Sequence, residues 1–326
     1  MIRVLISTGD PAGIGPEISI KAVSQLLDEG VKFVPILVID EPVISRVKKF
    51  FNVKKKITRW TEDKTGEIFF VETGVIKNTE FPSGINHHLT GMASFKYFEK
   101  AWQLLSNQYA DCLVTAPISK TAWKLAGIHY SGHTDALSSF SGEKTYMLMG
   151  TKNLKVLLTT VHIPMRDIWK HLTVEHLFLS TKITSEFIAK FFKIKNMSIG
   201  FCGLNPHAGE SGTMGDEENN IIIPAMEKLR QNGFSVSGPF PADAIFRKNI
   251  SDKDFDLIVS LYHDQAMIVL KTMFFEELVN ITVNASGWIR TSPGHGTAFD
   301  IAWTGKADVI PMKEAILTAI KMAKNN

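Results

Sequence analysis

Short apolar runs alternate with longer amphipathic segments along most of this 326-residue chain. Six runs are β-branched or apolar nearly throughout, which is typical of strands covered on both faces; they are Ile2–Ser7, Phe33–Ile39, Cys112–Thr115, Lys155–Thr160, Met197–Phe201 and Leu257–Leu261. Four segments between them have helical spacing: Ser94–Asn107, Val174–Phe192, Glu217–Asn232 and Met312–Lys324. Strands that alternate with helices of this length predict an α/β protein with a mostly parallel sheet.

The charge and cysteine content narrow the class of protein. The 36 Lys and Arg exceed the 33 Asp and Glu by only three, so the balance gives no reason to expect a nucleic-acid or membrane partner. Two cysteines, Cys112 and Cys202, are too few for a disulfide framework or a four-cysteine zinc site. No apolar run approaches the roughly 18 residues that span a bilayer, and the N-terminus lacks the apolar core of a signal peptide. We therefore expect a cytoplasmic protein.

The first predicted strand runs into a glycine-rich segment, Gly9–Glu17, which reads GDPAGIGPE. Pro16 suits the first turn of a helix, and Glu17 suits its positive end. The segment lacks the third glycine of G-x-G-x-x-G, and no Gly-Lys-Ser/Thr follows it. We therefore interpret it as a tight turn from strand to helix rather than a standard phosphate-binding loop.

Three of the ten histidines follow predicted strands: His162, His207 and His263. The carboxyl ends of parallel strands meet at one edge of a sheet, so these side chains can converge although they are far apart in sequence. Imidazole is a common ligand of zinc-like ions, and three ligands leave positions open for substrate. The alternative for each is an ordinary hydrogen-bonded histidine. Asp264 beside His263, and Asp243, supply carboxylates that can orient a ligand or act as a general base.

Ser131–Asp135 (SGHTD) opens a predicted helix. Backbone N–H groups at a helix start, with the side chains of His133 and Thr134, can bind a phosphate or carboxylate. The other interpretation is an N-cap, in which Ser131 or Thr134 satisfies the first turn, and both roles can hold at once.

Arg290–Thr297 (RTSPGHGT) is polar and rich in glycine, which predicts a loop outside the core. Arg290 can clamp a phosphate or carboxylate with two hydrogen bonds, and the glycines permit close approach of a ligand to the backbone. A plain surface loop is the alternative. Lys271 and Asn280 precede this segment and add polar groups to the same part of the sequence.

Nine stretches together resemble one family. In order they are STGDPAGIGPEI, VTAPISK, SGHTD, TTVHIPM, GLNPHAGESGTMGDEE, GPFPADAIF, YHDQAMIVLK, VNIT and IRTSPGHGTAFDIA. They resemble the PdxA family of pyridoxal phosphate biosynthesis, from about Ser7 to the C-terminus, and GLNPHAGE with YHDQ is a highly specific combination. The family is related to isocitrate and isopropylmalate dehydrogenases, whose GDGIGPE loop resembles Gly9–Glu17 without two of its residues.

The resemblance implies a reaction. Enzymes of this family oxidise the 3-hydroxyl of 4-phosphooxy-L-threonine with NAD or NADP, and the resulting β-keto acid loses CO2 to give 3-amino-2-oxopropyl phosphate. The resemblance also implies one divalent metal ion per site (zinc, magnesium, manganese or cobalt) on His162, His207 and His263. In the family the metal site is shared across a homodimer, with the third histidine coming from the partner subunit.

The resemblance further implies the roles of polar residues. Contacts with the small phosphorylated substrate fall to His133, Thr134, Lys271, Asn280 and Arg290. Lys271, Asp243 and Asp264 are the candidate catalytic residues. The residues expected beside the cofactor are Ser292, His295, Gly296 and Thr297.

The implied fold is two interleaved α/β/α domains of the isocitrate/isopropylmalate dehydrogenase type, with the active site in the cleft between them. No flexible linker is visible, which favours a chain that crosses between domains more than once. The expected division gives residues 1–128 and 288–326 to the first domain and residues 129–287 to the second.

The segment before Arg290 departs from the family pattern. After VNIT the family usually continues with a Gly-Leu-Pro-like turn, whereas residues 283–289 read VNASGWI, apparently one residue longer. The extra residue either shifts Arg290 or is absorbed locally. Two other functions stay open: a dehydrogenase of the same family that acts on 4-phospho-D-threonate or 4-phospho-D-erythronate, and a non-catalytic protein that binds a metal or metabolite.

Overall fold

The computed structural model describes residues 1–61 and 67–326, and it divides the chain into two compact units. Unit 1 comprises residues 1–142 and 288–324, and unit 2 comprises residues 143–287 with the last two residues. The chain thus leaves unit 1 and later returns to it. Residues 129–142 lie in unit 1, whereas the expected division gave them to the second domain. Their place follows from packing, because Phe140 stacks on Phe98 and Tyr130 stacks on Phe95.

Unit 1 is built on a parallel sheet with the strand order β3-β4-β2-β1-β5-β12. Its strands are β1 (Arg3–Ser7), β2 (Val34–Val38), β3 (Ile57–Arg59), β4 (Ile68–Val71), β5 (Cys112–Thr115) and β12 (Arg290–Pro293). Its helices are α1 (Gly15–Asp28), α2 (Glu41–Phe51), α3 (His88–Ser106), α4 (Lys120–Leu125), α5 (His133–Ser141) and α11 (Ile310–Lys324).

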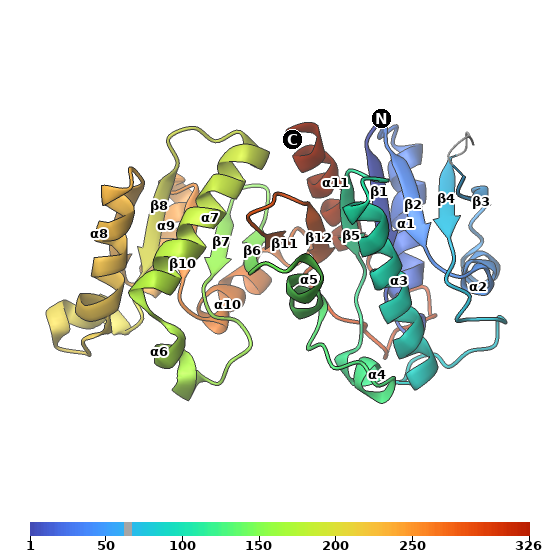
Figure 1. Ribbon diagram of the computed structural model, residues 1–326, viewed down its shortest axis with the longest axis horizontal. Helices are drawn as coiled ribbons and strands as arrows, with labels where there is room; N and C mark the ends of the chain where they lie inside the picture. Colours follow the sequence, from blue (N-terminus) through green and yellow to red (C-terminus); the bar gives the residue numbers. More distant parts are fainter. Residues whose placement is uncertain (62–66) are drawn as a thin grey trace. The chain divides into compact units, whose positions relative to one another are not determined.

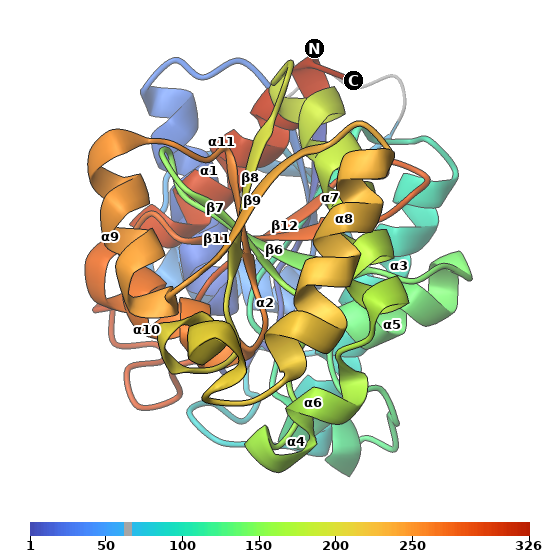
Figure 2. The same ribbon diagram turned by 90° about the vertical axis from the view of Figure 1, so that its left-hand side faces the viewer.

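Helices cover both faces of this sheet. Helix α3 packs on β1, β2 and β5 from one face, while α1 and α11 lie together on the other (Figures 1 and 2). The central strands are accordingly apolar: Val4, Leu5 and Ile6 of β1 are fully buried. Burial on both faces explains why these strands appear in the sequence as continuous apolar runs.

Unit 2 is built on a mixed sheet with the order β11-β6-β7-β10-β8-β9. Its strands are β6 (Tyr146–Gly150), β7 (Lys155–Leu158), β8 (Ser198–Cys202), β9 (Ser235–Phe240), β10 (Leu257–Ser260) and β11 (Val279–Val283). Its helices are α6 (Ile168–His171), α7 (Val174–Phe192), α8 (Ile223–Gln231), α9 (Ala242–Asp252) and α10 (His263–Phe274). Shorter helical turns span Met165–Asp167, Pro206–Gly212 and Glu218–Ile222.

Strand β6 runs antiparallel to both of its neighbours, β7 and β11. The turn between β6 and β7 is too short for a crossover, since the Thr151 N–H already donates to the Leu154 carbonyl at 2.8 Å. Helices α7 and α8 lie on one face of the sheet and α9 and α10 on the other (Figure 2). The core on the second face includes Val156, Phe246 and Ile258.

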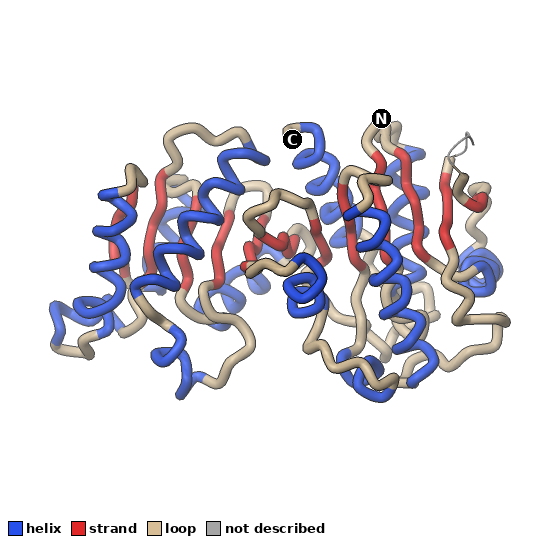
Figure 3. The backbone as a smooth tube through the Cα atoms, viewed as in Figure 1, coloured by secondary structure: helices blue, strands red, loops and turns tan. Residues whose placement is uncertain are grey.

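The six predicted strands are confirmed as β1, β2, β5, β7, β8 and β10, each within two residues of its expected ends. Three predicted helices are confirmed as α3, α7 and α11. The predicted helix over Glu217–Asn232 is split into a π-helical turn and α8, because Pro224 has no N–H with which to continue the α-helical pattern. Figure 3 shows the strands of each unit flanked by their helices. Among the described helices, none combines the length and apolar character that a membrane span needs.

Candidate active site

The glycine-rich segment after β1 forms a tight turn that leads into α1, as predicted. Gly9 has a φ of +72°, and a Cβ there would lie 2.3 Å from the Pro117 carbonyl oxygen. Asp10 is fully buried, and its Oδ1 accepts a hydrogen bond of 2.9 Å from the Ala12 N–H. Burial raises the pKa of Asp10 to about 6.

This turn lies against the loop predicted to bind the cofactor. The Ile14 N–H donates to the Thr297 carbonyl at 3.0 Å, and a Cβ on Gly13 would lie 2.8 Å from the same oxygen. Ser292 is buried in β12, Gly296 is exposed, and His295 and Thr297 are partly buried. The glycine-rich turn and the predicted cofactor loop therefore form one continuous part of unit 1.

The prediction that Arg290–Thr297 is a loop is wrong for its first four residues, which form the buried strand β12. Its polar groups find partners inside the fold: Thr291 Oγ1 donates to the Ala315 carbonyl at 2.8 Å. Arg290 is 2% exposed and donates through Nε and Nη2 to Thr115 Oγ1, at 3.1 and 2.6 Å. The composition of the segment could not reveal these partners, which come from distant parts of the chain.

His133 is in contact with Arg290. Its Nδ1 lies 3.2 Å from Arg290 Nη2, and its ring packs edge-on against Phe98 and Trp123. Burial, with a further contribution from the charge of Arg290, lowers the pKa of His133 well below its ordinary value. Two residues of the predicted substrate site, far apart in sequence, thus meet within unit 1.

The N-cap predicted as an alternative role for Ser131 or Thr134 is wrong. Gly132 is the N-cap residue of α5, and no side chain caps the helix. Asp135 instead accepts a hydrogen bond of 2.8 Å from the Ser131 N–H, which ties the start of α5 to the preceding turn. A φ of +153° at Gly132 explains why a glycine occupies the N-cap.

The three predicted metal ligands lie in unit 2, after the neighbouring strands β7, β10 and β8. His162 and His263 come together, with ring centroids 5.8 Å apart. His207 is exposed on the turn after β8. Within residues 1–61 and 67–326, no three His, Cys, Asp or Glu side chains are grouped as a metal ion would require. A single chain therefore brings together two of the three histidines.

Hydrogen bonds at the strand ends hold the segments that carry these histidines. Thr160 Oγ1 donates to the Leu261 carbonyl at 2.7 Å, which joins the end of β7 to the end of β10. His263 Nδ1 lies 2.7 Å from Asp264 Oδ1, so a ring that donates there presents Nε2 as the ligand nitrogen. Gln265 Nε2 donates to the Gly203 carbonyl at 2.8 Å and ties the loop after β8 to α10. This imidazole donor set suits a divalent ion such as zinc or cobalt.

Sequence reasoning gave no role to Glu218, although it lies in the GLNPHAGESGTMGDEE stretch. Glu218 is 2% exposed, and its Oε1 accepts hydrogen bonds of 2.8 Å from the Leu204 and Asn205 N–H groups. The turn that follows has left-handed φ values at five successive residues, from His207 to Ser211. Glu218 thus anchors the strained turn that carries His207. In the sequence, Glu218 is a glutamate three residues after a glycine-rich stretch. That pattern alone does not distinguish a buried carboxylate from one on the surface.

The other predicted site residues of unit 2 lie on separate elements. Lys271 is exposed in the last turn of α10, and Asp243 is exposed in the first turn of α9. Asn280 lies on β11, and its buried Oδ1 has no hydrogen-bond partner among the described residues. An acceptor in this position is suited to a ligand that brings its own donor.

The segment before Arg290 that departs from the family pattern forms a turn. Asn284 Oδ1 accepts a hydrogen bond of 2.6 Å from the Gly287 N–H, which closes a turn. Arg290 then pairs in register with Leu113 of β5. Trp288 packs edge-on against Trp102, with ring centroids 5.1 Å apart. The bulk of Trp288 is therefore placed against α3.

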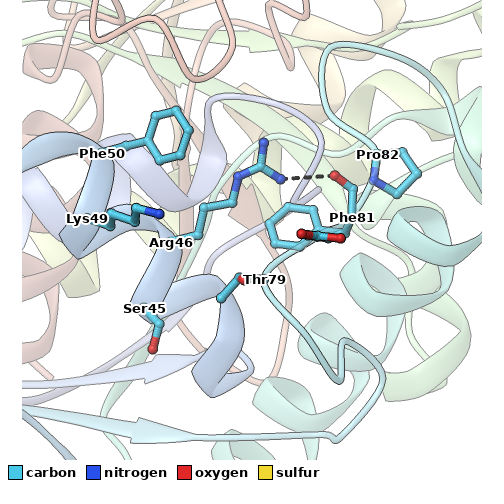
Figure 4. Close-up of a pocket in the computed structure, with 8 residues that line it drawn as sticks. Ser45, Arg46, Lys49, Phe50, Thr79, Phe81 and Pro82 are labelled. Carbon is cyan, nitrogen blue, oxygen red and sulfur yellow. Dashed lines mark hydrogen bonds between the residues drawn. The ribbon is translucent and has the colours of Figure 1, made fainter.

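A separate pocket of about 670 Å³ lies between α2 and residues 79–82 (Figure 4). None of the predicted site residues lines it. Arg46 in its wall donates to the Phe81 carbonyl at 2.9 Å and lies over the Trp303 ring, 4.3 Å from the centroid. Trp303 in turn donates to the Pro11 carbonyl at 3.0 Å. The pocket wall thus braces the glycine-rich turn from outside.

Known proteins resemble this chain over nearly its whole length. Residues 32–319 match the sequence profile of the family described as pyridoxal phosphate biosynthetic protein PdxA. A 4-hydroxythreonine-4-phosphate dehydrogenase from Sulfurihydrogenibium sp. (strain YO3AOP1) is 36% identical over 99% of this chain and 99% of its own length. A Clostridium botulinum (strain Hall) protein, provisionally named D-threonate 4-phosphate dehydrogenase, is 34% identical over 97% of this chain and 95% of its own length.

Solved structures agree with these matches. The crystal structure of 4-hydroxythreonine-4-phosphate dehydrogenase from Klebsiella pneumoniae is 33% identical, with a TM-score of 0.86 over 99% of this chain and 98% of that one. The fold and these likenesses place the chain among the α/β oxidoreductases. Within that class, the chain belongs to the PdxA family, which confirms the resemblance found in its sequence.

Proposed function

We propose that this chain is a dehydrogenase that oxidises the 3-hydroxyl of 4-phosphooxy-L-threonine with NAD or NADP, in the biosynthesis of pyridoxal phosphate. The β-keto acid that forms then loses CO2 to give 3-amino-2-oxopropyl phosphate. The observation that carries the proposal is the 36% identity to a 4-hydroxythreonine-4-phosphate dehydrogenase over 99% of both chains.

The chain's own residues bind and orient the substrate. His133, Thr134, Lys271, Asn280 and Arg290 are the residues assigned to its phosphate and carboxylate groups. The turn at Gly9–Glu17 and the loop of Ser292, His295, Gly296 and Thr297 hold the dinucleotide, since these segments are in direct contact. When bound, the nicotinamide accepts a hydride, and a divalent ion on the histidines acidifies the hydroxyl and stabilises negative charge on oxygen.

Lys271, Asp243 and Asp264 are the candidates for moving the hydroxyl proton. Asp264 is engaged with His263, which favours an orienting role for it. Exchanging each of the three for its neutral analogue, followed by pH–rate profiles, identifies the base: its loss removes the acidic limb of kcat/KM. The profile of Asp264→Asn should keep that limb.

We also propose a homodimer with a shared active site in the cytoplasm, in which one of the three histidines comes from the partner subunit. The support is that one chain pairs His162 with His263 but leaves His207 on an exposed turn. Mixing inactive His207→Ala and His263→Ala subunits should restore activity. Heterodimers without activity would count against sharing.

The direct test follows NADH or NADPH formation from 4-phosphooxy-L-threonine, with and without a chelator. Turnover that a chelator abolishes and added zinc, cobalt, manganese or magnesium restores is the expected result. Full turnover by a metal-stripped preparation would contradict the metal assignment. Ligand binding without any cofactor reduction would favour a non-catalytic protein instead.

A second candidate is a dehydrogenase of the same family that acts on 4-phospho-D-threonate or 4-phospho-D-erythronate. Two observations favour it: the 34% identity to the Clostridium botulinum protein, and Trp288 two residues before Arg290. Comparing kcat/KM for the L-threonine derivative and for both analogues separates the candidates. A preference for an analogue would replace the first proposal.

A further inference from the structure

Thr115 and Arg290 form a buried pair at the ends of two neighbouring strands. Arg290 begins β12 opposite Leu113 of β5, and Thr115 is two residues further along β5, on the same face of the sheet as Leu113. Thr115 is fully buried, and its Oγ1 accepts from both Nε and Nη2 of Arg290. A single oxygen thus fixes one whole edge of the guanidinium group.

The same Nη2 also faces His133 Nδ1, at 3.2 Å. A guanidinium group can only donate, so Nδ1 must accept and the ring proton must reside on Nε2. The rings of Phe98 and Trp123 pack against the imidazole and offer it no carboxylate. His133 Nε2 is out of contact with solvent and has no hydrogen-bond partner among the described residues.

We propose that His133 acts as a neutral hydrogen-bond donor through Nε2 rather than as a proton acceptor, and that Thr115 is the positioning residue that enforces this by holding Arg290. The acceptor is an oxygen of an anionic group on the ligand. Its identity rests on the proposed function, in which the ligand carries a phosphate and a carboxylate. The pairing of Thr115, Arg290 and His133 belongs to the free protein and does not depend on that function.

Thr115→Val tests the proposal, because it keeps the shape of the side chain and removes the acceptor. The guanidinium group then loses the two hydrogen bonds that Thr115 accepts, which weakens the hold on its position beside His133. We expect KM for the phosphorylated substrate to rise about tenfold, which corresponds to the loss of the hydrogen bond from His133 Nε2 to the charged group of the substrate. The value of kcat should change much less. Thr115→Ser retains the hydroxyl and should restore KM.

A spectroscopic measurement separates positioning from a merely structural role. Nitrogen-15 NMR of the full chain with ring-labelled histidine gives the tautomer and charge of each imidazole, and His133→Gln assigns the signal. We expect His133 to stay neutral with its proton on Nε2 between pH 5.5 and 8. In Thr115→Val it should become a mixture of tautomers or titrate within that range.

Thr291→Val is the matched control, since Thr291 is a buried threonine on β12 whose hydroxyl donates to Ala315 instead. It should leave the His133 signal unchanged. A wild-type His133 that carries its proton on Nδ1, or that titrates near pH 6.5, would overturn the proposal, as would a Thr115→Val spectrum identical to wild type. Because no substrate is needed, the expected spectra would support the inference even if 4-phosphooxy-L-threonine proved not to be a substrate.

Discussion

Replacing Glu218 with alanine should release the turn that carries His207. The buried carboxylate accepts two backbone hydrogen bonds of 2.8 Å, from Leu204 and Asn205, and one of 2.9 Å from Asn205 Nδ2. The turn has φ values between +42° and +75° at five successive residues, and only Gly209 among them is a glycine. The remaining four residues are held in a conformation that L-amino acids avoid.

The magnitude follows from two opposing terms. The left-handed conformation costs about 1–2 kcal/mol for each residue other than glycine, so four of them store about 4–8 kcal/mol. Hydrogen bonds to a charged group contribute about 1.5–3 kcal/mol each and offset this strain. When Glu218 is lost, two backbone N–H groups lose their acceptor, but the turn can relax and recover part of the strain. We therefore expect the free energy of unfolding to fall by about 3 kcal/mol.

Urea unfolding measures this loss, and amide hydrogen exchange locates it. Exchange should accelerate across residues 203–212 in Glu218→Ala. Glu217→Ala is the matched control, because Glu217 accepts from the Asn205 side chain at 2.8 Å but holds no backbone group of the turn among the described contacts. Its cost should stay below about 1 kcal/mol. A Glu218→Ala protein with the wild-type urea midpoint and unchanged exchange at 203–212 would refute this reasoning.

Three further predictions concern unit 1. The pKa of Asp10 is about 6 in the folded protein, against an ordinary value of 3.8. Between these two pH values the folded protein keeps a proton that the unfolded chain has lost, so the free energy of unfolding falls as pH rises from about 4 to 6. Asp10→Asn should remove this fall. Urea unfolding should show that the free energy of unfolding of the variant, relative to the wild type, is about 2 kcal/mol higher at pH 7.5 than at pH 4. Gly13→Ala should lower Tm because its Cβ would lie 2.8 Å from the Thr297 carbonyl, whereas Gly296→Ala, with open space around it, should not. Arg46→Met should lower the free energy of unfolding by about 2 kcal/mol in urea titrations, through the loss of two hydrogen bonds and ring contacts.

Much of the fold could be predicted because buried strands consist mainly of apolar residues, which can be recognised in the sequence. Strands such as β1 and β10 are buried along nearly their full length, and their central residues are all apolar. Strand β12 was predicted as a loop because its residues, RTSP, are polar, yet all four are buried. Burial of polar residues requires hydrogen-bond partners, and the partners are set by the folded chain rather than by the local sequence.

The candidate site could be predicted only from one rule, namely that the carboxyl ends of parallel strands meet at one edge of a sheet. That rule placed His162 near His263, and the structure pairs them. It could not find Thr115, which lies 175 residues from Arg290 in sequence, or Gln265, which ties its loop to Gly203. Such residues look ordinary in the sequence, because their role comes from one hydrogen bond to a distant group.

The cost of burying Arg290 is itself an argument about function. Removing a guanidinium group from water costs several kcal/mol, and burial lowers the pKa of Arg290 to about 9. Thr115 Oγ1 and His133 Nδ1 accept hydrogen bonds from this group, and neither is an anion. A bound anion would add a negative charge beside the buried guanidinium group, and the free energy gained would appear as affinity and as added stability. A phosphorylated hydroxy acid should therefore raise the Tm of this protein more than its dephosphorylated counterpart does, and Arg290→Met should abolish that difference if Arg290 binds the phosphate. A difference that persists in Arg290→Met would assign the phosphate to another cation, such as Lys271.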